Sequence, residues 1–269
     1  MSELTFRPRQ SLGQNFLMDE NVARKIIRTL TPNPEDVIVE IGPGFGVLTA
    51  HVLPVARRVV AVEIDRRLVQ QLQTRFAGFD NLELVTGDFL KVELEPYRQG
   101  SARLRVLGNI PYHITSPVIF KVFEARQHVQ DMLLMIQREV AERIVARPRC
   151  KAYGILSVFS QLYAEPEIAF HVSSNVFVPR PEVGSSVVRW DFSGAQRRRV
   201  ADEALLGKII RTCFNQRRKM LRKSLKRVAG AEQLLSQIDF DLQRRPEELS
   251  VEEFVELSNQ FAEAWKNRT

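Results

Sequence analysis

The sequence predicts an α/β fold with a mostly parallel sheet, followed by a small all-α domain. Stretches of helical periodicity alternate with short apolar runs rich in β-branched residues, at 37–41, 59–62, 82–86 and 104–107. This alternation is typical of parallel strands joined by crossover helices. After residue 192 the apolar residues recur only at helical spacing. We therefore expect a first domain at 1–192 and a helical domain at 193–269.

Length and composition are those of an ordinary globular protein. With 269 residues, of which 44% are hydrophobic, the chain is long enough to fill two cores. Its two cysteines, Cys150 and Cys213, provide neither a disulfide framework nor a metal-ligand cluster, and the four histidines are scattered. No apolar run approaches the length of a membrane span, and no signal-peptide core follows the N-terminus. The sequence thus predicts a cytoplasmic protein without a metal site or a membrane partner.

The charge balance points to a polyanionic partner. Lysine and arginine outnumber the acids by 39 to 32, and the sequence pI is about 9.7. An excess of this size also occurs for solubility alone, but here the charge is concentrated. Apolar residues at helical spacing place an acid-free basic run on a helix, namely Arg217, Arg218, Lys219, Arg222, Lys223, Lys226 and Arg227. The candidate RNA-binding residues are those of this run other than Arg227.

The N-terminal residues 7–17 are basic, polar and irregular, and they precede a helix that Asp19 is expected to cap. They are either a simple tail or a lid. The density of Gln14, Asn15 and Phe16 next to Leu17 favours a segment that folds over a ligand.

The first strand leads into a glycine-rich turn, Glu40-Ile41-Gly42-Pro43-Gly44-Phe45-Gly46, and the turn opens into a helix. A tight turn needs glycine even where nothing binds. However, the next strand ends on Glu63, where an acid would meet the ribose hydroxyls of a nucleoside. Val47 occupies the place of the third glycine of the dinucleotide fingerprint, which disfavours a nicotinamide or flavin enzyme.

The next two strands also end on polar residues. Asp88 follows the strand at 82–86, where it is either a helix cap or an acceptor for an adenine amino group. The strand at 104–107 leads into Asn109-Ile110-Pro111-Tyr112.

This four-residue motif suits methylation of an exocyclic adenine amine. The lone pair of that nitrogen is delocalised into the ring, so the amine needs hydrogen-bond acceptors before it can attack. Asn109 Oδ1 and the carbonyl of Ile110 are such acceptors, and Pro111 restricts the backbone that holds them. Tyr112 offers a ring on which an unstacked base can lie.

The remaining pattern completes the two domains. A strand at 132–136, helices at 138–146 and 155–163, and strands at 167–172 and 187–192 close the first domain. Between the last two strands, Phe177 lies in a proline-rich loop as a possible second aromatic wall for the target base. A basic linker at 193–199 precedes the helical domain, in which Ser250 and Glu253 form a capping box.

Taken together, these motifs resemble the ribosomal RNA adenine dimethyltransferases over the whole chain. They lie at residues 12–17, 40–46, 62–65, 87–88 and 109–112. The resemblance implies a Rossmann-like class I methyltransferase sheet with S-adenosylmethionine as cofactor. By position, it implies that Asn15 and Leu17 close over the cofactor, Gly42 contacts its amino-acid end, Glu63 its ribose and Asp88 its adenine, with Asn109 between cofactor and target amine.

The basic motif at 214–226 and residues 245–250 resemble the bacterial small-subunit branch of the family. This implies dimethylation of two adjacent adenosines near the 3′ end of 16S rRNA in the immature 30S subunit, by a monomer. His113 and Gly184 depart from the family pattern, which commonly has Asn and Asp there. The alternatives are an assembly factor in which methylation is secondary, the macrolide-resistance branch acting on large-subunit RNA, and, more distantly, a dehydrogenase.

Overall fold

A computed structural model describes residues 6–9, 12–98, 100, 103–194, 200–228 and 232–267. The chain folds into two compact units, each described by itself below. The first comprises Met1–Ala141 and Glu167–Ser193, and the second comprises Glu142–Pro166 and Gly194–Thr269. Most of the predicted linker, residues 195–199, lies outside the described residues.

The first unit is built on a seven-stranded sheet with the order β4-β3-β2-β5-β6-β9-β7. Its strands are β2 Val37–Ile41, β3 Arg58–Glu63, β4 Leu82–Thr86, β5 Leu104–Asn109, β6 Val129–Gln137, β7 Glu165–Val172 and β9 Ser185–Asp191. The pairs among β2 to β6 are parallel, and β9 runs antiparallel to β6. The predicted α/β class is confirmed.

The order of the strands reverses direction between β2 and β5. The chain proceeds outward from β2 through β3 to β4, and then returns to the other side of β2 to form β5 and β6. In open α/β sheets, ligands bind beyond the carboxyl ends of the strands at such a reversal. Here Ile41 pairs with Gly108, so Gly42 and Asn109 emerge beside each other at that edge.

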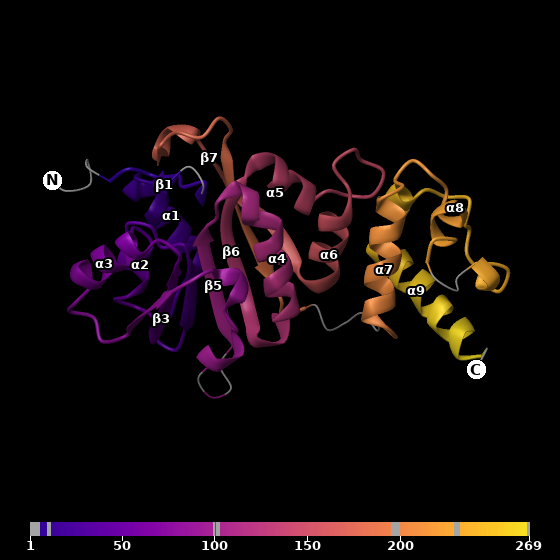
Figure 1. The fold of residues 1–269 in the computed structure, drawn as a ribbon, viewed down its shortest axis with the longest axis horizontal. Coiled ribbons are helices and arrows are strands. Elements are labelled where there is room, and N and C mark those ends of the chain that lie inside the picture. Colours follow the sequence, from indigo (N-terminus) through magenta and orange to yellow (C-terminus); the bar gives the residue numbers. More distant parts are fainter. Residues whose placement is uncertain are drawn as a thin grey trace. The chain divides into compact units, whose positions relative to one another are not determined.

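Helices pack on the sheet through apolar faces that the sequence pattern predicts. They are α1 Glu20–Leu30, α2 Thr49–Val52, α3 Arg66–Arg75 and α4 Thr115–Glu124. Helix α5, Arg138–Ile144, follows β6 and spans the boundary between the residues of the two units. Asp19 caps α1 by accepting from the amides of Asn21 and Val22. One core cluster combines α1, α2 and α3 with inward side chains of the strands, such as Ile38, Leu107 and Leu133. In Figure 1, α4 lies in front of β5 and β6.

The N-terminal residues 6–9 and 12–17, hereafter the strap, are fixed by a two-stranded sheet of their own. Its strands are β1 Phe16–Leu17 and β8 Phe177–Val178, which pair antiparallel. Met18 N also donates to the carbonyl of Val176, at 2.9 Å. The strap is therefore tied to a segment about 160 residues further along the chain, which a simple tail would not be.

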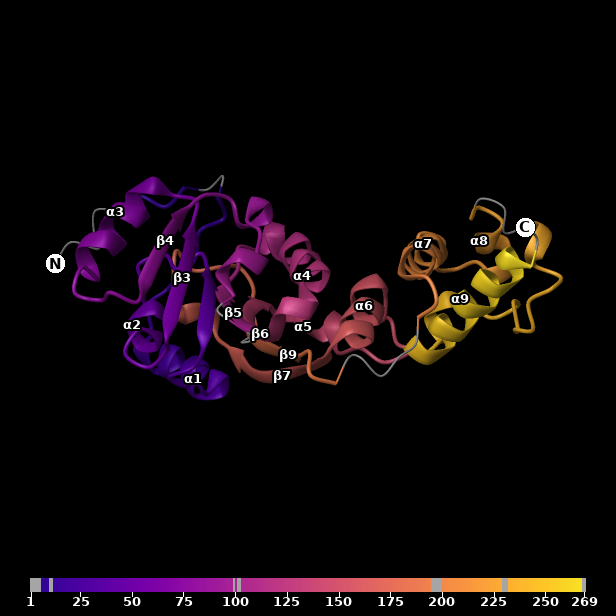
Figure 2. The same ribbon diagram turned by 90° about the horizontal axis from the view of Figure 1, so that it is seen from below.

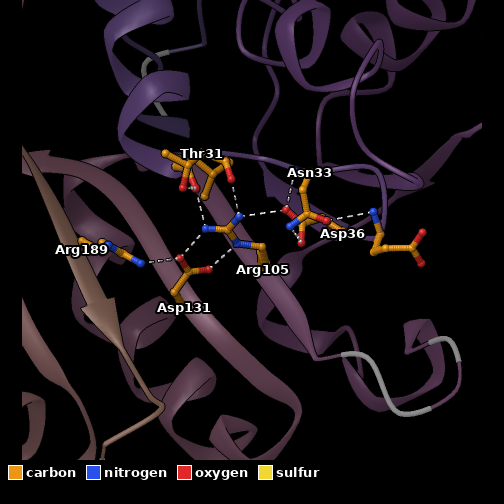
Figure 3. A network of polar contacts seen from close by, with 8 residues as sticks. Thr31, Asn33, Asp36, Arg105, Asp131 and Arg189 are labelled. Atoms are coloured by element: carbon orange, nitrogen blue, oxygen red, sulfur yellow. Dashed lines mark hydrogen bonds and ion pairs between the residues drawn. The ribbon is translucent and has the colours of Figure 1, made fainter.

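A buried ionic network joins the amino-terminal ends of the central strands (Figure 3). Arg105, the second residue of β5, is 3% exposed and donates to both oxygens of Asp131 on β6, at 2.7 and 2.6 Å. Its Nη1 also donates to Asp36 Oδ2, at 2.8 Å. The carbonyls of Leu30 and Thr31, at the end of α1, accept its remaining hydrogens. Every arm of this guanidinium is used, so one residue links β5, β6, the start of β2 and α1.

The second unit is helical. It contains α6 Ile155–Tyr163, α7 Glu203–Phe214, α8 Leu221–Leu225 and α9 Val251–Lys266. Helices α7 and α9 lie side by side (Figure 2), and Phe214 packs against Phe254 with ring centroids 5.8 Å apart. The predicted capping box is present: Ser250 accepts from Glu253 N, and Glu253 accepts from Ser250 N.

The division of the chain differs from the single boundary expected between residues 192 and 193. Residues 142–166 belong to the second unit, because their side chains pack there. Tyr153 is fully buried and its hydroxyl donates to the carbonyl of Leu249 at 2.8 Å, while its ring meets Phe214 edge-on. Such contacts depend on tertiary packing, and local periodicity does not report them.

The basic run does not lie on one helix, so that prediction was wrong. Helix α7 ends at Phe214, and α8 begins only at Leu221. Tertiary hydrogen bonds break the helix: the amides of Leu221 and Arg222 donate to the carbonyls of Arg244 and Leu242, at 2.8 and 2.9 Å. Arg217 is held in the intervening turn by contacts described below.

We expect Arg105→Met to lower the free energy of unfolding by about 3 kcal/mol, because it removes the guanidinium shared by the buried carboxylates of Asp36 and Asp131. Arg189 still pairs with Asp131 at 3.4 Å and Asn33 still donates to Asp36, which limits the loss. Urea denaturation measures this. Arg57→Ala is the matched control, since Arg57 forms an exposed pair with Glu35 at 3.7 Å and should change stability by less than about 1 kcal/mol. Equal effects of the two substitutions would contradict a structural role for the network.

Candidate functional site

A cavity opens at the carboxyl edge of the sheet, where the strand order reverses. Its walls are the glycine-rich turn after β2, the ends of β3, β4 and β5, the strap, and Phe177 of β8. It brings together every cofactor-site and target-site residue proposed from the sequence, namely Asn15, Leu17, Gly42, Glu63, Asp88, Asn109, Ile110, Pro111, Tyr112 and Phe177. Their placement in one cavity is a structural fact, whereas their individual contacts with ligands stay predictions.

The glycine-rich turn needs its glycines for different reasons. Gly42 has a φ of 63°, and a Cβ there would meet nothing closer than the Asn109 carbonyl, at 4.0 Å. Its backbone therefore faces open space beside the β2–β5 reversal. Gly46, with a φ of 80°, is sterically required, because a Cβ would lie 2.5 Å from the ring of Phe76. Only Gly42 leaves room for a ligand.

Two buried carboxyl groups lie behind this turn. Glu63 is 4% exposed and accepts from Gly44 N at 3.2 Å and from Asp65 N at 2.9 Å, so it holds the turn in place. Burial raises its pKa above the ordinary value. Glu40 is 1% exposed, and Thr49 Oγ1 donates to it at 2.6 Å. The pKa of Glu40 is raised to about 7, mainly by burial. The hydrogen bond from Thr49 opposes this rise, and the charge of nearby Glu63 contributes to it.

Asp88 serves as the helix cap that the sequence left open. Its Oδ1 accepts from Leu90 N at 3.0 Å, at the start of the short 3₁₀ helix Phe89–Lys91. The side chain is half-buried and still lines the cavity. Because a carboxylate has two oxygens, capping leaves acceptor capacity for a ligand.

The Asn109 motif is positioned by the end of β5. Asn109 is the last residue of the strand, and its Nδ2 donates to the carbonyl of Asn15 at 2.9 Å. Ile110 N donates to the Met135 carbonyl of β6 at 3.1 Å, which fixes the peptide beyond the strand. Tyr112 is half-buried, and its hydroxyl lies 3.1 Å from Ser185 Oγ, so the ring has a defined orientation.

Phe177 is 3% exposed and belongs to the core cluster of the first unit, although it also lines the cavity. Its role as a second wall for the target base stays a prediction.

The basic residues of the second unit divide into two groups. Arg217 is engaged by the protein itself: its guanidinium donates to Glu247 Oε2 at 2.6 Å and to the carbonyls of Lys151 and Cys150 at 2.6 and 3.0 Å. Lys226 pairs with Glu232 at 2.7 Å. Within the described part of the chain, four others are exposed and have neither a side-chain hydrogen bond nor an ion pair: Arg218, Lys219, Arg222 and Lys223.

Arg218 and Lys219 line a hollow of about 820 Å³ in the second unit. The sequence did not single out the other cations around it, Arg149, Lys151 and Arg245. They come from segments far apart in the chain, and the turn that carries Arg149 and Lys151 is held by Arg217. Arg149 and Lys151 lie about 95 residues before Arg245 in the sequence, so only the fold shows that these cations surround one hollow.

The sequence also missed the residues that hold the strap against the cavity. Asp65 is buried and accepts from Gln14 Nε2 at 3.3 Å and from the guanidinium of Arg67 at 2.6 Å. Arg67 holds the pKa of Asp65 down at about 2. Arg67 also lies over the ring of Phe6, 4.3 Å from its centroid. An acidic residue at a helix start is common, so Asp65 followed by Arg67 gave no indication in the sequence that these residues hold the strap.

Among the residues that the structure describes, no helix is long and apolar enough to cross a bilayer. No group of three or more His, Cys, Asp or Glu side chains among them is arranged to hold a metal ion.

Comparison with known sequences gives a match along nearly the whole chain. The family model described as ribosomal RNA adenine dimethylase matches residues 5–263. Proteins named ribosomal RNA small subunit methyltransferase A are similar to the chain. That of Clostridium botulinum (strain Loch Maree) is 38% identical over 96% of each chain. That of Chlorobium phaeobacteroides is 41% identical over 94% of this chain and 91% of its own.

Solved structures give the same picture. A dimethyladenosine transferase from Plasmodium falciparum superimposes with a TM-score of 0.80 at 26% identity, covering 93% of this chain and 98% of its own. The 23S rRNA methyltransferase ErmE superimposes with a TM-score of 0.68 at 26% identity, covering 92% of this chain and 100% of its own. The class I methyltransferase fold is thereby confirmed.

The raised pKa of Glu40 predicts a specific pH dependence of stability. In the unfolded chain this carboxyl ionises near its ordinary value of 4.5, whereas in the folded chain it stays protonated up to about pH 7. The free energy of unfolding therefore falls as pH rises from about 4.5 to 7, and the decrease reaches about 3 kcal/mol above pH 7. Glu40→Gln should abolish this loss, since a glutamine is neutral at every pH and its oxygen still accepts from Thr49.

We expect wild type and Glu40→Gln to have similar free energies of unfolding near pH 4 and to diverge towards pH 8, where the variant is more stable. Denaturant titrations across that pH range measure the difference. Glu35→Gln is the control, because the Glu35 side chain is 84% exposed and should leave the pH profile unchanged. Parallel profiles for wild type and Glu40→Gln would contradict the assignment.

Proposed function

The chain belongs to the ribosomal RNA adenine dimethylase family, and we propose that it transfers methyl groups from S-adenosylmethionine to two adjacent adenosines near the 3′ end of 16S rRNA. The immature 30S subunit is the proposed substrate particle, acted on by a monomer in the cytoplasm, with an accompanying role in small-subunit biogenesis. The observation that carries the proposal is the cavity at the β2–β5 reversal, which is lined by Gly42, Glu63 and Asp88 together with Asn109 and Tyr112.

The cavity residues fit S-adenosylmethionine. Glu63 at the end of β3 offers carboxylate oxygens to a ribose, and Asp88 after β4 keeps an acceptor for an adenine amino group. The half-buried backbone at Gly42 has free space beside it for the amino-acid end. When bound, the cofactor supplies a methyl group on a positively charged sulfur, which makes that carbon electrophilic.

The protein's own contribution to the reaction is alignment and hydrogen bonding. Asn109 Oδ1 and the carbonyl of Ile110 accept the two hydrogens of the target amine, which draws its lone pair out of the ring and towards the methyl carbon. Pro111 limits the movement of that carbonyl. Tyr112, held through Ser185, supports the extruded base. After transfer the methylated nitrogen is acidic enough to release its proton to water.

The second unit supplies cations for RNA. Arg218, Lys219, Arg222 and Lys223 are exposed, and the hollow beside Arg218 adds Arg149, Lys151 and Arg245. Phosphate contacts of this kind hold RNA in register without reading its sequence. They support binding to a folded ribosomal RNA, while the first unit carries the chemistry.

The test of this function is methyl transfer from labelled S-adenosylmethionine to purified small subunits from cells that lack the modification. Large subunits and naked RNA are assayed in parallel, and nucleosides are analysed afterwards. We expect dimethyladenosine on the small subunit alone. Label on large-subunit RNA would place the chain with the resistance enzymes. Tight small-subunit binding without label would leave an assembly factor.

Asn109→Ala should lower the rate constant of methyl transfer by about 100-fold or more, because it removes an acceptor that acts on the amine during transfer. RNA affinity should stay within about twofold, since no proposed phosphate contact changes. Single-turnover transfer and filter binding measure the two quantities separately. Equal losses in both would contradict the role given to Asn109.

The neighbouring arginines Arg217 and Arg218 should respond differently to replacement. Arg217→Ala removes three hydrogen bonds within the protein, so we expect a lower melting temperature. The combined variant Arg218→Ala, Arg222→Ala, Lys223→Ala should keep the wild-type melting temperature but weaken RNA binding. Its slope of log K against log salt should flatten by about 2 to 3. A salt slope that matches wild type would show that these cations are merely solvated.

A further inference from the structure

The side-chain amide of Asn109 has a defined orientation. Its Nδ2 lies 2.9 Å from the main-chain carbonyl oxygen of Asn15, a residue 94 positions earlier in the strap. A carbonyl oxygen can only accept a hydrogen bond, so the NH₂ arm of the amide must face the strap. Oδ1 therefore lies on the opposite arm, and it is the acceptor that remains for a ligand in the cavity.

The strap is itself held rigidly enough to impose this choice. Gln14 links the two described parts of the strap to each other and to the start of α3: its Oε1 accepts from Arg9 N at 2.8 Å, and its Nε2 donates to Asp65, the N-cap of α3, at 3.3 Å. Arg67 binds Asp65 and lies over the ring of Phe6. Phe6 in turn packs edge-on against Phe45 of the glycine-rich turn, with centroids 5.3 Å apart.

A second contact joins the strap to the loop that follows Asn109. Gly13 has a φ of 59°, and a Cβ there would lie 2.8 Å from His113 Nδ1. The backbone of the strap thus lies directly on the His113 ring, next to the Pro111 side chain. The strap therefore contacts the Asn109–His113 segment at both of its ends.

We propose that the strap is a positioning element for methyl transfer, in which the Asn15 carbonyl selects the amide orientation that presents Asn109 Oδ1 to the target amine. This inference rests on the proposed function. An asparagine amide is almost unchanged in shape when it turns by 180°. In the turned state it would offer its own hydrogens to the hydrogens of the amine, and transfer would fail. The hydrogen bond to Asn15 removes that state.

Asn109→Asp separates this idea from a simple requirement for an acceptor. An aspartate is at least as good an acceptor as asparagine. When ionised, however, it has no hydrogen for the Asn15 carbonyl, and the two oxygens repel each other. This repulsion and partial burial both raise the pKa of the new carboxyl. When protonated, its hydroxyl can donate to Asn15 while its other oxygen accepts from the amine, which restores the wild-type pattern.

The experiment measures single-turnover methyl transfer to small subunits by wild type, Asn109→Asp and Asn109→Ala between about pH 8.5 and about pH 5.5, the range of raised carboxyl pKa values. We expect the aspartate variant to be about 100-fold slower than wild type at the highest pH and to recover at least about tenfold relative to wild type at the lowest. The alanine variant should show no such recovery. Cofactor and RNA affinities are measured at each pH, to keep binding apart from transfer.

Wild-type rates in the aspartate variant at high pH would overturn the inference, because they would show that donation to Asn15 is unnecessary. An aspartate variant as slow as the alanine variant at every pH would also overturn it. A wild-type protein that transfers no label to adenosine would instead overturn the proposed function, so the two failures are distinguishable.

Arg67→Ala provides an independent test through the strap. Loosening the contacts of Arg67 with Asp65 and Phe6 should slow transfer by about fivefold or more in wild type, but by less than about twofold in an Asn109→Ala background, where no amide is left to orient. An equal loss in both backgrounds would mean that the strap acts on transfer without acting through Asn109.

Discussion

The buried guanidinium of Arg105 is the interaction on which the rest of the first unit depends. It lies at the start of β5 and neutralises Asp131 on the next strand and Asp36 at the start of β2, while it also binds the last carbonyls of α1. A buried ion pair is not strongly stabilising by itself, but its geometry admits few alternatives. It therefore fixes the stagger of β5 against both neighbours, which a purely apolar parallel sheet specifies less firmly.

The consequence appears four residues later, about 13 Å along the strand, where β5 ends at Asn109. If β5 slipped by one residue, Asn109 would turn to the other face of the sheet. With the register set at Arg105, Gly108 pairs with Ile41, and the glycine-rich turn and the Asn109 motif meet at the same edge. The pairing of β1 with β8 helps to hold the strap at this edge, so residues from both ends of the first unit complete one cavity.

Much of the fold and of the cavity lining could be predicted from the sequence, because these features depend on local sequence patterns. The strands are nearly continuous apolar runs, Asp19 and Ser250 lie at helix starts, and the polar residues at the strand ends stand one after another. What could not be predicted depends on distant partners: the pair of Arg105 with Asp131, the packing of Tyr153 beneath Leu249, and the hydrogen bond from Asn109 to Asn15. The basic run shows the same limit, since tertiary bonds at Leu221 and Arg222 break the helix that its periodicity predicts.

The two ends of β5 differ in the hydrogen-bonding groups that their surroundings require. At Arg105 the surrounding groups are two carboxylates and two carbonyls, all acceptors, and a cation with five hydrogens satisfies them. At Asn109 one neighbour is a carbonyl that needs a hydrogen, and the other side of the residue faces a cavity where an acceptor is required. A carboxylate at position 109 could not donate to the carbonyl, and a cation could not accept a hydrogen bond from a ligand in the cavity. A neutral amide meets both requirements without adding charge to a cavity that the buried Glu40 and Glu63 also line, which is the physical reason for an asparagine at this position.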